Sequence, residues 1–242
     1  MGYDDDRRGI STEEAQLQAA VLKYREAWRD NSLTPEIVND AWSAFWTERV
    51  AAAGMNPVEM PSYDGDAAKL TALQIQDRGI VLVPKVFLQE PGGMLLLGTL
   101  FPKMGISPNN TSQYTHEDYG VYVDTEMVTD APNRRPNRET TVKDANSSYT
   151  DIKKPLSLPF YIAGSQMNKL LWGTYFDQNN TISIVDGSNL SHGAHDKDHL
   201  TRSLEARFEA SGKLIVKTIS LAIPLLAKDR GRRGFRTAGL RK

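Results

Sequence analysis

Cysteine is absent from the sequence. Its absence excludes disulfide bonds, thiolate metal ligands and a cysteine nucleophile. Long apolar runs are absent as well, and none approaches the roughly 18 residues that a transmembrane helix needs. Residues 1–8 are mostly charged and hold no apolar segment, so no secretory signal peptide is predicted. We therefore expect a cytoplasmic or virion protein that does not enter a membrane.

The common signatures of nucleotide and hydrolase chemistry are also missing. The chain has no Gly-x-Ser-x-Gly nucleophile elbow. It has neither a Gly-x-x-x-x-Gly-Lys-Ser/Thr phosphate loop nor a Gly-x-Gly-x-x-Gly dinucleotide motif. No sign of charge is in excess, because 29 lysines and arginines face 30 aspartates and glutamates. An overall positive field for nucleic acid is therefore excluded, and only local clusters of charge can contribute.

The sequence predicts a helical hairpin near its beginning. Ser11 opens a capping box, and a helix should follow over residues 12–29. Thr34 suits the N-cap of a second helix, with proline in its first turn, and Gly54 should end that helix. Asp66 suits the N-cap of a short third helix.

Three large aromatic side chains lie close together on the second predicted helix. They are Trp42, Phe45 and Trp46. In one interpretation they pack against a sheet of the same chain. In the other they form an interface for a second chain, because aromatic anchors dominate the energetics of interfaces.

The clearest pattern of the sequence lies near the C-terminal end. Residues 204–210 alternate apolar with charged side chains, which is typical of a strand with one buried face. Gly212 follows in a turn, and residues 213–221 are rich in β-branched side chains. This pattern predicts an antiparallel hairpin. A short helix over residues 201–210 is the alternative, because Leu, Glu, Ala and Arg also suit helices.

Further segments between these ends favour strands. Residues 80–88 and 94–101 are apolar runs joined by a glycine-containing loop, which predicts a second hairpin. Residues 156–163 are also expected to form a strand, although Pro159 interrupts it. The remaining candidates are strands over residues 119–123 and 181–185, and either a helix or a strand over residues 167–176.

These elements together predict an α+β fold, in which an N-terminal helical hairpin packs on a mainly antiparallel β-sandwich or barrel with long polar loops. The 242 residues are 40% hydrophobic and 24% charged, as in ordinary globular proteins. The expected organisation is a flexible segment over residues 1–10, a single domain over 11–227 with a helical part over 11–76 and a β-rich part over 79–227, a polar arm over 130–154 within that part, and a basic tail over 228–242.

The few histidines allow a hypothesis of a metal site. Histidine and carboxylate are the natural ligands of zinc, iron or manganese where no thiolate exists. His116 and Asp118 have the His-x-Asp spacing of a two-histidine, one-carboxylate site, for which the third ligand would be His192, His195 or His199. A solvated polar loop is the simpler interpretation of the last three histidines.

The C-terminal end carries a cluster of basic side chains. It consists of Lys228, Arg230, Arg232, Arg233, Arg236, Arg241 and Lys242. Glycines between them predict a flexible tail that contacts phosphate backbones without reading sequence. The same tail can instead pair with the acidic surface of a neighbouring subunit, such as the one that Asp4, Asp5 and Asp6 provide.

The sequence thus favours a non-enzymatic structural subunit of a larger oligomeric assembly, such as a coat, connector or tail protein of a virus or phage particle. Its partners would be copies of itself and other subunits, with arms and tails that lock neighbours together. We expect no cofactor. The alternatives are a metal-dependent enzyme and an accessory protein that binds nucleic acid non-specifically through the basic tail.

Overall fold

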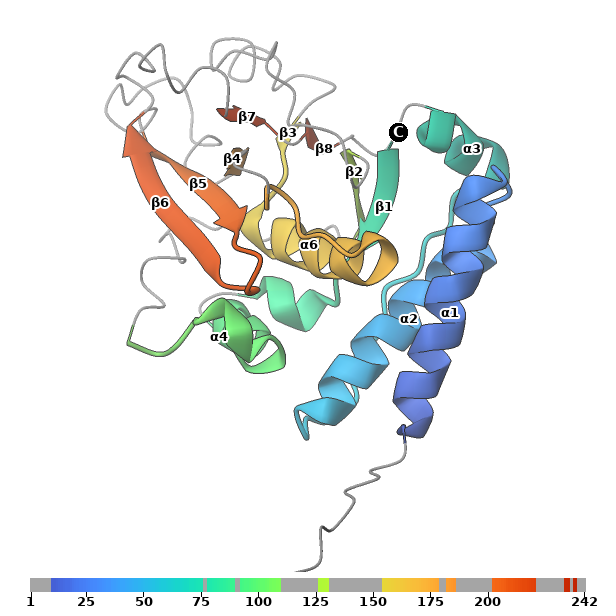
Figure 1. Cartoon of the computed structure of the whole chain (residues 1–242), viewed down its shortest axis with the longest axis horizontal. Coiled ribbons are helices and arrows are strands. Elements are labelled where there is room, and N and C mark those ends of the chain that lie inside the picture. The colour runs from blue at the N-terminus through green and yellow to red at the C-terminus, as the bar shows by residue number, and fades with distance from the viewer. Residues whose placement is uncertain are drawn as a thin grey trace, which may run out of the picture.

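The fold is α+β in a computed structural model of the chain (Figure 1). A helical hairpin lies beside a central helix, α6 (Leu158–Trp172), and the long strands β5 (Arg202–Phe208) and β6 (Leu214–Ser220) lie on the other side of α6. The structure describes residues 10–75, 78–89, 92–109, 126–130, 154–178, 182–185, 202–220, 233–235 and 237–238.

The predicted helical hairpin is confirmed. It consists of α1 (Thr12–Arg29) and α2 (Pro35–Ala52). The side-chain oxygens of Ser11 and Thr34 each accept a hydrogen bond from the backbone N–H three residues ahead, at 3.1 and 3.3 Å. The third helix, α3 (Ala67–Ile75), begins in the same way, since the carboxylate of Asp66 accepts from Lys69 N at 2.6 Å. Helix starts are therefore fixed by local capping.

Two segments that the sequence assigned to strands are helices. Residues 94–101 belong largely to α4 (Gly92–Leu100), and residues 156–163 largely to α6 (Leu158–Trp172). The predicted interruption at Pro159 is instead the first turn of α6, where proline has no hydrogen bond to lose. Both helices are apolar on most sides, and such runs do not distinguish a buried helix from a buried strand.

The segment over residues 80–88 is a strand only in its first part. β1 (Arg78–Leu82) gives way after Pro84 to the 3-10 turn η1 (Lys85–Leu88). β1 pairs antiparallel with β2 (Glu126–Asp130) and not with residues 94–101, so the second predicted hairpin is wrong. Gly93, in the first turn of α4, lies close to η1, since a Cβ there would be 2.4 Å from the carbonyl oxygen of Phe87.

The C-terminal hairpin is confirmed and forms half of a four-stranded sheet of order β6-β5-β4-β7. β5 (Arg202–Phe208) and β6 (Leu214–Ser220) pair antiparallel, with Phe208 opposite Leu214. Gly212 occupies the turn at a φ of 90°, which suits glycine. β4 (Ile182–Val185), the predicted strand over residues 181–185, lies on the other side of β5. The short helix over residues 201–210 is thereby excluded.

The tail over residues 228–242, which the sequence predicts to be flexible, contains two short strands, and each pairs with a strand from elsewhere in the chain. β7 (Arg233–Phe235) runs parallel to β4, and β8 (Thr237–Ala238) pairs with β3 (Lys154–Pro155). The described strands make one four-stranded and two two-stranded sheets, and each of these sheets is open. Residues 1–9 of the expected flexible segment over residues 1–10 lie outside the described residues. The same holds for the expected strand over residues 119–123 and for residues 131–153 of the polar arm over 130–154.

The aromatic side chains of α2 form the centre of the core. Trp42, Phe45 and Trp46 are 2%, 0% and 0% exposed. They are therefore core residues, and the prediction that they form an interface with a second chain is wrong. The chain itself covers them. The indole N–H groups donate to the carbonyl oxygens of Ile80 and Leu82 in β1 at 3.0 and 2.8 Å. The Trp46 ring also stacks on Phe87, with 4.9 Å between centroids.

We expect Trp46→Phe to lower the free energy of unfolding by about 1–3 kcal/mol, because the buried carbonyl of Leu82 loses its donor. Trp46→Ala should cost about 3–5 kcal/mol, because it also leaves a cavity. Urea denaturation followed by circular dichroism measures both values. Leu22→Ala is the control, since Leu22 is 53% exposed. Equal stabilities of the wild type and Trp46→Phe would contradict this role of the indole.

Candidate functional site

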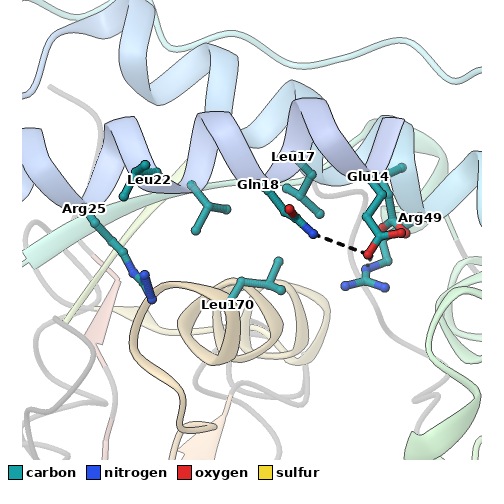
Figure 2. A pocket seen from close by; sticks show the side chains of 9 residues that line it. Glu14, Leu17, Gln18, Leu22, Arg25, Arg49 and Leu170 are labelled. Carbon is teal, nitrogen blue, oxygen red and sulfur yellow. Dashed lines mark hydrogen bonds and ion pairs between the residues drawn. The ribbon is translucent and has the colours of Figure 1, made fainter. Parts of the chain in front are cut away.

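A groove lies between α1 and α6, with the C-terminal part of α2 at one end (Figure 2). Its volume is about 440 Å³. Most of the lining comes from α1, and Leu170 of α6 faces it across the groove. The lining residues are Glu14, Leu17, Gln18, Val21, Leu22, Arg25, Glu48, Arg49 and Leu170.

The groove has an apolar middle. Leu17 and Val21 are buried, because they belong to the face of α1 that packs inward. Leu170 is half-buried. Leu22 projects beside them and is 53% exposed, which makes it one of the most exposed large apolar side chains among the described residues. The groove therefore offers both a recess and an apolar knob to another surface.

One end of the groove is formed by Arg25. Its side-chain Nε–H donates to the carbonyl oxygen of Leu171, in the last turn of α6. A cation at that position stabilises the end of a helix, because the free carbonyls there carry partial negative charge. No carboxylate pairs with Arg25 within the described part of the chain. The guanidinium thus keeps capacity for a partner anion.

The other end of the groove is formed by Arg49 and two carboxylates. Arg49 Nε lies 3.2 Å from Glu48 Oε2, and its guanidinium carbon lies 5.9 Å from the centroid of the Phe45 ring. Burial raises the pKa of the nearby Tyr175 hydroxyl, and the positive charge of Arg49 opposes that rise. Glu14 accepts a hydrogen bond from the Gln18 amide at 3.4 Å (Figure 2) and pairs with no described cation.

A second polar cluster is buried on the far side of α6. The carboxylate of Asp177 accepts hydrogen bonds from the hydroxyls of Tyr161 at 2.9 Å and Ser183 at 2.5 Å. Tyr161 and Ser183 are fully buried and Asp177 is 6% exposed. The Tyr161 hydroxyl also lies 3.3 Å from the carbonyl oxygen of Ala206. Because Tyr161 belongs to α6, Ser183 to β4 and Ala206 to β5, the cluster holds the helix to the sheet.

The residues of the metal hypothesis lie outside the described residues. They are His116, Asp118, His192, His195 and His199. Most of the basic tail lies outside as well, namely Lys228, Arg230, Arg232, Arg236, Arg241 and Lys242. Arg233 is the exception, since it begins β7 opposite Ile182.

The groove itself was not predicted from the sequence. Leu17 and Val21 were recognisable as the apolar face of the first helix, but Leu170 is far away in the chain and lies in a segment of undecided structure. Arg25 gives no local signal, because its partner is a backbone carbonyl 146 positions away.

Within the described residues, no helix is long and apolar enough to cross a membrane, and no three or more metal-ligating side chains lie together. Comparison with known proteins found no matching family model, no matching curated protein and no matching solved structure. The groove and the buried cluster therefore have to be interpreted from their own chemistry.

We expect Asp177→Ala to lower the free energy of unfolding by about 2–4 kcal/mol. Two buried hydroxyls lose their acceptor, and alanine disfavours the positive φ of 58° at this position. Asp177→Asn should cost less, because asparagine keeps an acceptor oxygen and tolerates a positive φ. Thermal and urea unfolding measure both variants. Equal losses for alanine and asparagine would contradict the assigned role of this carboxylate.

Proposed function

We propose that this chain is a non-enzymatic structural subunit of a larger oligomeric assembly, as a coat, connector or tail component of a virus or phage particle. The observation that carries the proposal is the groove along α1. It combines an exposed Leu22 with Glu14 and Arg25, which have no partner of opposite charge within the described residues. An apolar centre with a charged rim is the arrangement of a protein interface.

The chemistry of the groove agrees with a binding role. Its polar side chains are two carboxylates, two guanidinium groups and one amide, and its lining has no hydroxyl or imidazole. Such groups form ion pairs and hydrogen bonds with another protein surface. The buried Asp177 cluster, in turn, is explained by the attachment of α6 to the sheet.

The end of the chain gives independent support. β7 lies at the edge of its sheet and is joined to β4 through three residue pairs. A short strand at a sheet edge is the kind of element that subunits exchange or add to a neighbour. The oppositely charged ends of the sequence, with Asp4 to Asp6 at one end and the basic tail at the other, suit contacts of the same kind.

We expect the purified protein to associate as its concentration rises. Light scattering after size exclusion, over a wide range of protein concentrations, should show a mass that grows beyond that of one chain. High salt should reduce the growth, because screening weakens ion pairs at a rim. A mass that stays at that of one chain at every concentration would overturn the assembly proposal.

A further inference from the structure

We infer that the groove along α1 is the contact between two copies of this chain, related by a two-fold axis, with their α1 helices antiparallel. This inference deepens the proposed function and depends on it, since it names the surface through which subunits first pair. In a two-fold contact each copy contributes the same surface, so that surface has to be complementary to itself. The exposed side of α1 meets this requirement.

The charged side chains of α1 that line the groove, Glu14 and Arg25, have opposite signs and lie towards opposite ends of the helix. Glu14 lies in the first turn, whereas Arg25 and Arg29 lie towards the last turn. In the described residues none of the three has a partner of opposite charge. If a second α1 runs antiparallel along the groove, Glu14 of each copy lies opposite Arg25 of the other. Two ion pairs then form, one on each side of the axis.

The apolar residues agree with the same register. The midpoint between Glu14 and Arg25 falls between Ala19 and Ala20. A two-fold axis at this point keeps each side chain on the same flank of the contact, so the exposed Leu22 side chains of the two copies lie on one flank, about 7–8 Å apart along the helix direction. Each copy therefore covers part of Leu22 of the other.

The end of the helix provides a second pair with the same midpoint. Ile10, just before α1, is 62% exposed, and the symmetric position on the second copy is Arg29. Apolar side chains pack well on the aliphatic part of an arginine. One register thus pairs Glu14 with Arg25 and also covers the exposed side chains of Ile10 and Leu22.

The size of the contact predicts its strength. α1 has 18 residues, which corresponds to about 27 Å of helix. One helix pair of this length buries no more than the lower end of the roughly 1,200–2,000 Å² that specific stable interfaces cover. We therefore expect a reversible dimer with a dissociation constant of about micromolar order, which further contacts extend in the assembly.

A charge exchange tests the register. Glu14→Arg and Arg25→Glu should each weaken self-association by at least about tenfold, because each brings like charges together twice. An equimolar mixture of the two variants should associate again, since the arginine introduced in one variant then meets the glutamate introduced in the other, and both remaining wild-type groups also pair. Analytical ultracentrifugation measures all three samples. The matched control is Glu13→Arg, which makes the same change about 100° around the helix.

Arg25 also caps α6, so a second variant is needed that leaves internal contacts intact. Leu22→Glu removes an exposed side chain and should weaken association by at least about tenfold without lowering the melting temperature. Retained association in Leu22→Glu, or failure of the two charge variants to recover on mixing, would overturn the α1 contact. If the wild type nevertheless assembles, the assembly proposal stands and another surface carries it. A wild type that is monomeric at every concentration overturns both.

Cross-linking gives a direct measurement of the geometry, because the natural chain has no cysteine. The two Gln18 side chains should lie about 4–5 Å apart along the helix direction, on the facing sides of the two helices. Gln18→Cys should therefore yield a disulfide-linked dimer on mild oxidation. Gln16→Cys, also exposed but on another side of α1, is the control and should remain single-chain. Equal yields from both positions would contradict the proposed axis.

Discussion

The fold depends on a match between the repeat of α2 and the repeat of β1. Trp42 and Trp46 are one helical turn apart, which places their indoles about 6 Å apart along the helix. The carbonyls that accept from them, in Ile80 and Leu82, are two strand positions apart, or about 6.6 Å. Because the two repeats agree, both indoles donate at once. The helical hairpin is thereby fixed in register with the small β1–β2 sheet.

This attachment determines where α6 lies and hence where the groove forms. α6 contacts both α1 and β1, while its other side is held to β4 and β5 by Tyr161 and the Asp177 carboxylate. The helix is almost completely buried, with its last turn directed towards α1 (Figure 1). Arg25 binds that end through a carbonyl oxygen. The contacts of α2 with β1 and of α6 with β4 and β5 thus fix the positions of α1 and α6, and the groove lies between these two helices.

The sequence predicts the elements that depend on nearby residues and fails for those that depend on distant contacts. The helix starts at Ser11 and Thr34 and the turn at Gly212 depend on neighbours within a few residues, and they were predicted correctly. Uniform apolar runs carry no period, so the sequence predicts strands where the helices α4 and α6 form. Their form is decided by burial and by close approaches such as that at Gly93, which the sequence does not display.

The charges on α1 make the proposed contact between two subunits weak and reversible. Each charged end of an isolated α1 is solvated, so one surface ion pair contributes only about 0–1 kcal/mol. Two-fold symmetry doubles every contact, and a single register satisfies charge and apolar burial together. A weak contact of this kind dissociates when subunits pair wrongly and gains strength once further contacts link the same subunits. Reversible pairing along α1 would therefore favour correct assembly over rapid, misaligned growth.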